Sequence, residues 1–141
     1  MTAGDPIPDA DHVARGIHPR AFDRGEIQST AFQPGSRDKG KLSTDWVKCA
    51  YAKPAHRNVE GSLARLRRSL ILIPQRVAIL KARSIRGIHW DDRKLDAIED
   101  PDPPDRPCHS AIIGMKDDEG DLGLQQALAD LANAGQVVIL R

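Results

Sequence analysis

The last third of the chain constrains the fold most, because it carries three consecutive segments with different hydrophobic patterns. HSAIIGM is a short apolar strand pattern, and LGLQQALADLANAG places Leu124, Leu128 and Leu131 on one helical face. The final QVVILR is almost continuously apolar, which is typical of a strand that is central or covered on both faces. Strand, helix and strand in this order predict a βαβ unit, with 111–115 and 136–140 as neighbouring parallel strands.

Two elements upstream extend this unit. EGSLARLRRSLILI, residues 60–73, predicts a helix with Leu63, Leu66 and Leu70 on one face, and RVAILKARSI, residues 76–85, predicts a strand of the same sheet. A chain of 141 residues fits one domain. We therefore expect a single compact α+β (or α/β) domain with a small mixed sheet and about two main helices.

The first half of the chain has weaker patterns. Residues 1–11 are rich in Pro, Asp and Gly and predict a flexible arm, so that the domain itself comprises residues 12–141. HVARGI, residues 12–17, predicts a strand. LSTDWVKCAYAK, residues 42–53, predicts a short helix with Ser43 or Thr44 as N-cap. The acidic, proline-rich residues 96–107 predict an irregular loop.

The composition indicates an intracellular protein. Aromatic residues make up only 4% of the chain, so the core must be aliphatic. The two cysteines, Cys49 and Cys108, form no CxxC motif, and the N-terminus has no apolar segment of a signal peptide. The longest apolar run is far shorter than the ~20 residues that span a bilayer. We expect a cytoplasmic location, reduced thiols and no membrane partner.

Charge is segregated although the net charge is only +1. Residues 57–89 contain eight basic residues and one acidic residue, whereas residues 91–121 contain eleven acidic and four basic residues. Outward-facing basic side chains on 65–86 could bind an anion or nucleic acid. The candidates are Arg65, Arg68, Arg76, Lys81, Arg83 and Arg86.

The triplet CHS contains three residue types used in nucleophilic catalysis. In an extended segment Cys108 and Ser110 share one face and His109 takes the other, so the three cannot form a triad among themselves. Two readings remain open: the start of a buried strand in which Cys108 and Ser110 are packing residues, or a functional pocket lined by His109. Ser110 is separately a candidate pocket residue.

Other polar residues could contribute to such a pocket. His12, Arg15 and Ser43 are candidate catalytic residues, and Trp46 is a candidate pocket wall. His12 and His18 would lie about 20 Å apart on a strand, too far for one metal ion. The sequence has no GxGxxG, Walker A, HExxH, GxSxG or EF-hand motif, so we predict neither a metal nor a cofactor.

Four runs, PDADHVARGIHP, STAF, LSTDW and CHSAIIGM, resemble a family of short uncharacterised bacterial proteins. The shared pattern is DHVxR, AF, LSxxW and H[SA]xIxG, and it spans nearly the whole chain. This resemblance implies a single bacterial domain. The order of these motifs is also similar to ADP-ribosyltransferase-like folds, which implies that Arg15 or His12 would hold a nicotinamide cofactor together with Ser43. The catalytic Glu of those folds has no counterpart after the second motif.

Two functions follow from these observations. The absence of catalytic signatures and the segregated charge favour a non-enzymatic binding or accessory module with a protein partner, or nucleic acid bound through the basic residues of 65–86. The alternative is a small enzyme with an ADP-ribosyltransferase-like nucleotide pocket built from His12, Arg15, Ser43 and His109. The alternative requires that these four side chains converge.

Overall fold

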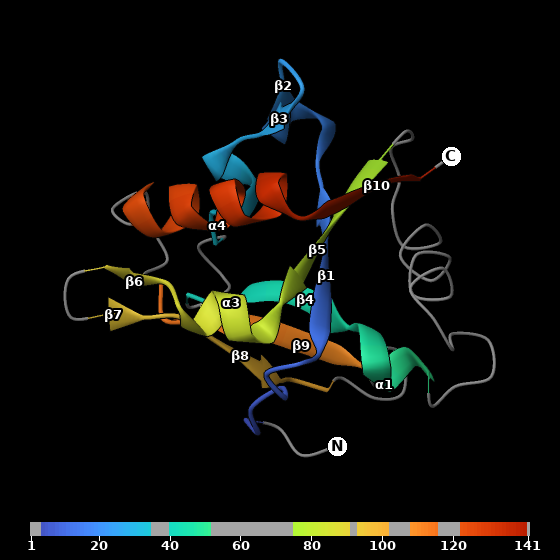
Figure 1. Ribbon diagram of the computed structural model, residues 1–141, viewed down its shortest axis with the longest axis vertical. Coiled ribbons are helices and arrows are strands. Elements are labelled where there is room, and N and C mark those ends of the chain that lie inside the picture. The colour runs from blue at the N-terminus through green and yellow to red at the C-terminus, as the bar shows by residue number, and fades with distance from the viewer. Residues whose placement is uncertain are drawn as a thin grey trace.

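The fold is described from a computed structural model, which places residues 4–34, 40–51, 75–90, 93–101, 108–115 and 122–140. Six strands form one sheet in the order β10-β5-β1-β4-β9-β8, and every neighbouring pair is antiparallel (Figure 1). Their bounds are β1 His12–Ile17, β4 Leu42–Trp46, β5 Gln75–Lys81, β8 Asp96–Glu99, β9 His109–Ile113 and β10 Gln136–Leu140. The chain is a single compact α+β domain, as predicted.

Shorter elements decorate this sheet. Two small hairpins lie outside it, one made of β2 Phe22–Asp23 and β3 Glu26–Ile27, the other of β6 His89–Trp90 and β7 Arg93–Lys94. The described helices are η1 Pro19–Ala21, η2 Ser29–Phe32, α1 Val47–Tyr51, α3 Ala82–Arg86 and α4 Leu122–Ala134. No helix in the described ranges is both long and apolar enough to cross a bilayer.

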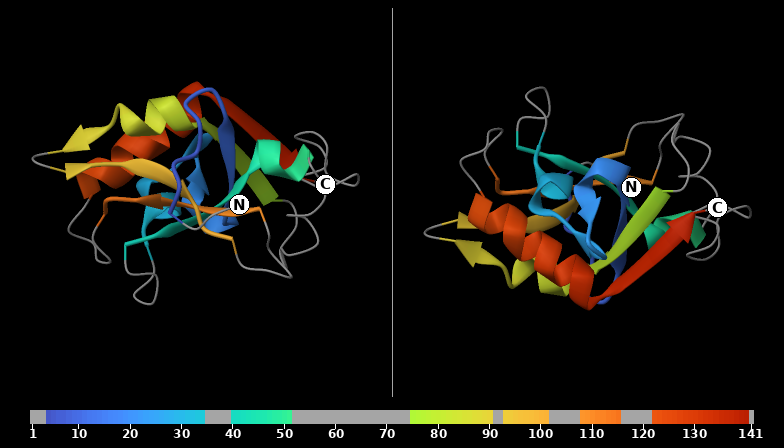
Figure 2. Two further views of the ribbon diagram at one scale, coloured as in Figure 1. Left: turned by 90° about the horizontal axis from the view of Figure 1, so that it is seen from below. Right: turned by 90° about the horizontal axis from the view of Figure 1, so that it is seen from above.

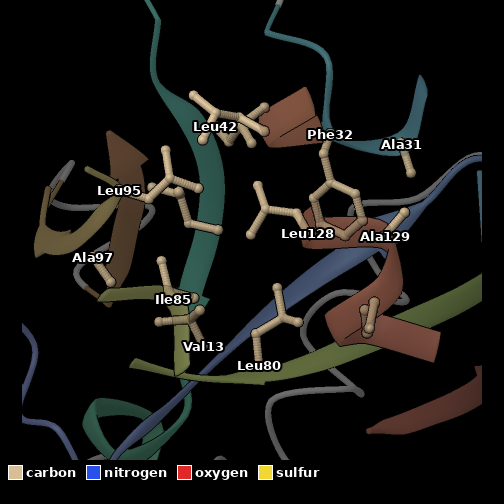
Figure 3. Packing of buried hydrophobic residues seen from close by; sticks show 14 of the residues in the cluster. Val13, Ala31, Phe32, Leu42, Leu80, Ile85, Leu95, Ala97, Leu128 and Ala129 are labelled. Atoms are coloured by element: carbon tan, nitrogen blue, oxygen red, sulfur yellow. The ribbon is translucent and has the colours of Figure 1, made fainter. Parts of the chain in front are cut away.

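The core lies between one face of the sheet and α4. Side chains of a strand alternate between its faces, so Val13, Leu42 and Leu80 reach the same side from three strands. Figure 3 shows them around Leu128 of α4 and Phe32 of η2, and all five are at most 1% exposed. Burying each large aliphatic side chain contributes about 1.5–3 kcal/mol. The core is aliphatic apart from Phe32, as the composition predicts.

The C-terminal crossover differs from the prediction in its pairing. Because neighbours in the sheet alternate in direction, β9 and β10 do run parallel, and α4 connects them. They are not neighbours, however, since β5, β1 and β4 lie between them. The 13 residues of α4 extend about 20 Å, which matches the about 19 Å across four strand spacings. The helix thus crosses the sheet and leads directly into β10 (Figure 2).

Strand β10 lies at an edge of the described sheet, so of the two alternatives predicted for it, a central strand or a strand covered on both faces, the first does not hold among the described strands. The apolar run reports how the faces of a strand are covered. It contains no information about backbone hydrogen bonding, which decides whether a strand is central or at an edge.

Three local predictions were only partly right. Residues 42–46 are strand β4, and a helix begins only at Val47; pairing with β1 and β9 outweighs the capping preference of Ser43 and Thr44. The strand predicted for residues 76–85 ends at Lys81, where α3 begins, because Ala and Arg favour a helix. Residues 96–99 of the predicted loop form β8, since the prolines that exclude a strand begin only at Pro101.

Residues 4–7 are packed against β8, in contrast to the flexible arm predicted for residues 1–11. The backbone N–H groups of Gly4 and Ile7 donate to Glu99 and Ala97 at 2.8 and 2.9 Å. Ile7 is fully buried. The composition of this segment favours a loop, but the side chain of Ile7 packs into the core. The helix predicted for residues 60–73 lies outside the described residues.

The prediction of reduced thiols was wrong. Cys49 of α1 and Cys108, just before β9, form a disulfide with Cα atoms 5.5 Å apart. This separation is within the normal range for disulfides. The 59-residue sequence separation gave no indication of this contact, which depends on the pairing of β4 with β9.

Candidate functional site

The pairing of β4 with β9 brings Ser43 and His109 together. Ser43 pairs with Ala111, and Asp45 pairs with His109, so Ser43 and His109 are diagonal neighbours. Alternation places both on the sheet face opposite the one that packs against α4, because Leu42 and Ile112 belong to the core.

His109 bridges two polar partners. Its Nε2 lies 3.0 Å from Ser43 Oγ. Its Nδ1 lies 2.8 Å from the backbone carbonyl of Asp100 and 3.3 Å from Asp100 Oδ2. Both partners of Nδ1 are acceptors, so Nδ1 carries the proton in the neutral ring, and Nε2 accepts from the Ser43 hydroxyl. The result is a chain from carboxylate through imidazole to hydroxyl.

Ser43, His109 and Asp100 differ in exposure, and a catalytic serine requires an exposed hydroxyl beside a fixed base. Ser43 is exposed, whereas the His109 side chain retains only 9% of its accessible surface and that of Asp100 33%. The hydroxyl can therefore meet a ligand, while the ring that would accept its proton is held by surrounding atoms. This order of groups is the arrangement by which a serine is activated as a nucleophile.

Lys41 lies on the same face of the sheet as Ser43, whereas Arg15 contacts the Ser43 backbone from the core face. Lys41 Nζ lies 3.9 Å from Asp100 Oδ1 and is half exposed. Arg15 donates from Nε to Ala31 O at 2.8 Å and from a terminal nitrogen to Ser43 O at 2.7 Å. Its guanidinium also lies 5.9 Å from the centre of the Phe32 ring. Arg15 thus holds the backbone of Ser43 to η2, and this use of its donors differs from the expected role in catalysis.

Ser110 and Trp46 are not part of this cluster. Ser110 is fully buried on the core side of the sheet, where its Oγ lies 2.6 Å from Thr44 Oγ1. Trp46 Nε1 donates to Asp11 Oδ2 at 3.0 Å. Ser110 is therefore not part of a pocket with His109, because consecutive residues of β9 point to opposite faces, as strand alternation predicts.

His12 is also separate from Ser43. The register of β1 and β4 pairs Ala14 with Asp45, so His12 lies about 13 Å further along the sheet than Ser43. It lines a pocket of about 180 Å³ together with Ile79, Leu80, Lys81, Ser84, Leu131 and Gly135. Of the four residues that the nucleotide-pocket hypothesis requires, only Ser43 and His109 converge: Arg15 reaches the Ser43 backbone from the core face, and His12 lies further along the sheet.

The basic residues predicted to form one surface have different environments in the structure. Arg76 lies over the Phe22 ring, 3.5 Å from its centre, while Lys81 and Arg83 are exposed. Arg65 and Arg68 lie outside the described residues.

The guanidinium of Arg86 is bound by other groups of the protein. It donates to Asp96 at 2.7 Å, to Asp9 at 2.6 Å and to the backbone carbonyls of Ile7 and Ala97. Burial opposes its charge, but the hydrogen bonds and charges of Asp96 and Asp9 outweigh this penalty and raise its pKa. Arg86 therefore anchors the N-terminal segment and does not present its charge to an anion, in contrast to the prediction.

Asp100 was missed by sequence reasoning. It lies in the stretch that was predicted as an acidic loop, and nothing in the sequence pairs it with His109. The signal that could have found it is the hairpin-like pairing of β8 with β9, which places the residue after β8 beside the first residue of β9. Its backbone N–H donates to His109 O at 3.0 Å.

Within the described part of the chain, no group of three or more metal-ligating side chains gathers. Comparison with protein-family models, with curated proteins and with solved structures finds no match to the chain. The resemblance to short bacterial proteins stays a prediction.

Proposed function

We propose that the protein is a small hydrolase of esters or related activated acyl compounds, with Ser43 as nucleophile, His109 as general base and Asp100 as the residue that orients His109. The observation that supports this proposal most directly is the 3.0 Å contact between Ser43 Oγ and His109 Nε2, with Nδ1 anchored on Asp100. A hydroxyl at this distance is within reach for proton transfer.

The reaction would follow from this geometry. His109 Nε2 takes the proton of Ser43 as Oγ attacks the acyl carbonyl, and Asp100 stabilises the imidazolium that forms. The imidazolium then gives its proton to the leaving group, which departs and leaves an acyl group on Ser43. A water molecule, activated by the same imidazole, hydrolyses this ester and regenerates the hydroxyl.

The asymmetry of the cluster favours chemistry over a purely structural histidine. Two oxygens of Asp100, one from the backbone and one from the carboxylate, already satisfy the donor of His109. His109 Nε2 is paired with the exposed hydroxyl of Ser43, which is the member of the cluster most open to a ligand. Such a pairing adds little to stability, because water could replace the hydroxyl.

A fluorophosphonate, which phosphonylates activated serines, tests the proposal. We expect one adduct, located on Ser43 by peptide mass spectrometry, and no adduct in Ser43→Ala. Ser84→Ala is the matched control, since Ser84 is half-buried and lies outside the cluster, and it should react like the unsubstituted protein. An unreactive Ser43, or an equal reaction in both variants, would contradict the proposal.

Binding to a polyanion is a second candidate, favoured by the exposure of Lys81 and Arg83. A single-stranded oligonucleotide should then bind more weakly as salt rises, and more weakly to Lys81→Glu/Arg83→Glu. Equal binding by both proteins would remove this candidate. A protein partner, the cytoplasmic location and the bacterial origin remain predictions.

A further inference from the structure

The disulfide Cys49–Cys108 lies directly beside the proposed base. Cys108 precedes His109 in the chain, and Cys49 lies in α1, which begins immediately after β4 ends at Trp46. The backbone N–H of Trp46 donates to Cys108 O at 2.9 Å, in continuation of the β4–β9 pairing. The disulfide therefore closes the end of this strand pair, one residue from the imidazole.

The contact between Ser43 and His109 depends on that strand pair. The hydroxyl comes from β4 and the ring from β9, so any change in the relative position of the two strands alters their distance. A slip of one residue would turn His109 toward the opposite face. The start of β9 is held to β4 by backbone hydrogen bonds, and the disulfide adds a covalent restraint between the residue before β9 and α1, the helix that follows β4.

We infer that Cys49–Cys108 positions His109, and that its reduction by a dithiol switches the Ser43 site to low activity. This inference rests on the proposed function. The reduction is a two-electron exchange. A thiolate of the dithiol attacks one protein sulfur and forms a mixed disulfide; its second thiol then displaces that sulfur. The products are two protein thiols and the oxidised, cyclic dithiol.

The burial of the two cysteines indicates where this exchange begins. Cys108 is 5% exposed, whereas Cys49 is half-buried on the five-residue helix α1. Attack at the Cys49 sulfur releases the Cys108 thiol, so the part of the chain next to His109 is freed in the first step. Exchange with an excess of the oxidised, cyclic dithiol reverses both steps and re-forms the disulfide.

The test compares the full chain, air-oxidised and treated with dithiothreitol, by two readouts. One is the rate of fluorophosphonate labelling of Ser43. The other is the imidazole ¹⁵N and ¹H NMR spectrum of His109, which reports the environment of the ring without any reaction. A thiol titration establishes the redox state, and far-UV circular dichroism establishes that the chain is folded. Cys49→Ala/Cys108→Ala is the control for direct effects of the reductant.

We expect reduction to slow labelling by up to about 100-fold, because misplacement of a reacting group by about 1 Å has effects of this size. The His109 signals should shift, and reoxidation should restore both readouts. The double variant should not respond to dithiothreitol.

Three results would overturn the inference: unchanged labelling and unchanged His109 signals after the thiols are titrated as free; global unfolding on reduction, which would make the disulfide a general staple; or two free thiols in the air-oxidised protein. If the oxidised protein is not labelled at all, the proposed function fails, and the His109 spectrum still decides whether the disulfide positions the ring.

Discussion

Two pairs of polar side chains connect β4 with β9, one pair on each face of the sheet, and the two pairs differ in their exposure. Thr44 and Ser110 meet at 2.6 Å on the core face, where both are almost completely buried. Ser43 and His109 meet at 3.0 Å on the other face, where the hydroxyl is exposed. Both pairs contain a hydroxyl and join the same two strands. The local exposure of the hydroxyl therefore decides whether such a polar pair stabilises the fold or is available to a ligand.

The largest effect should follow from His109→Gln. Glutamine keeps much of the side-chain volume and a donor, but it cannot act as a base. Labelling of Ser43 should fall by about 100- to 10,000-fold, the usual contribution of a general base, while the melting temperature changes little. The measurement is the second-order rate of fluorophosphonate labelling. A large loss of stability with no change in the rate would make this pair equivalent to the buried one.

Removal of the disulfide should lower the free energy of unfolding of the whole strand pair. A disulfide that closes a loop of this length stabilises by about 4 kcal/mol, chiefly by restricting the unfolded chain. Urea unfolding of Cys49→Ala/Cys108→Ala, compared with the oxidised protein, measures this difference. A difference below about 1 kcal/mol would show that the disulfide adds little to the strand pair.

The smallest of the three effects should come from the buried pair. Ser110→Ala leaves the Thr44 hydroxyl without its partner in the core and should destabilise the protein by about 1–3 kcal/mol. Thr44→Val in addition removes the orphaned hydroxyl, so the double variant should recover most of this loss. Both variants should still be labelled at Ser43. Loss of labelling in a folded Ser110→Ala protein would mean that the two faces are coupled.

The elements that were predicted well have patterns that are complete within one segment. The helix at 122–134 and the strand at 109–113 carry their own periodicity, and the structure confirms both. Strand alternation within CHS likewise predicts that His109 and Ser110 point to opposite faces, as they do in β9. The segment LSTDW was misassigned because its local signals indicate a cap, whereas its conformation depends on two partner strands.

The candidate site was predictable only in part, for the same reason. Ser43 and His109 were recognisable as chemical groups, whereas the Arg15 side chain lies on the opposite face of the sheet and donates to the backbone carbonyl of Ser43. Asp100 and the bond between Cys49 and Cys108 had no local signal, because each depends on a partner more than eight residues away. His12 was assigned to the site only because a histidine can act as a base. The register of β1 against β4 places it away from Ser43 along the sheet.

The sequence by itself determined the α+β class, the aliphatic core and which residues could carry chemistry. These properties depend on composition and on periodicities of two or 3.6 residues, which can be read along a single segment. Only the tertiary structure decided the order of the strands, the edge position of β10 and the meeting of Ser43, His109 and Asp100. Those depend on backbone hydrogen bonds between distant segments, and the backbone groups that form them are the same in every residue except proline.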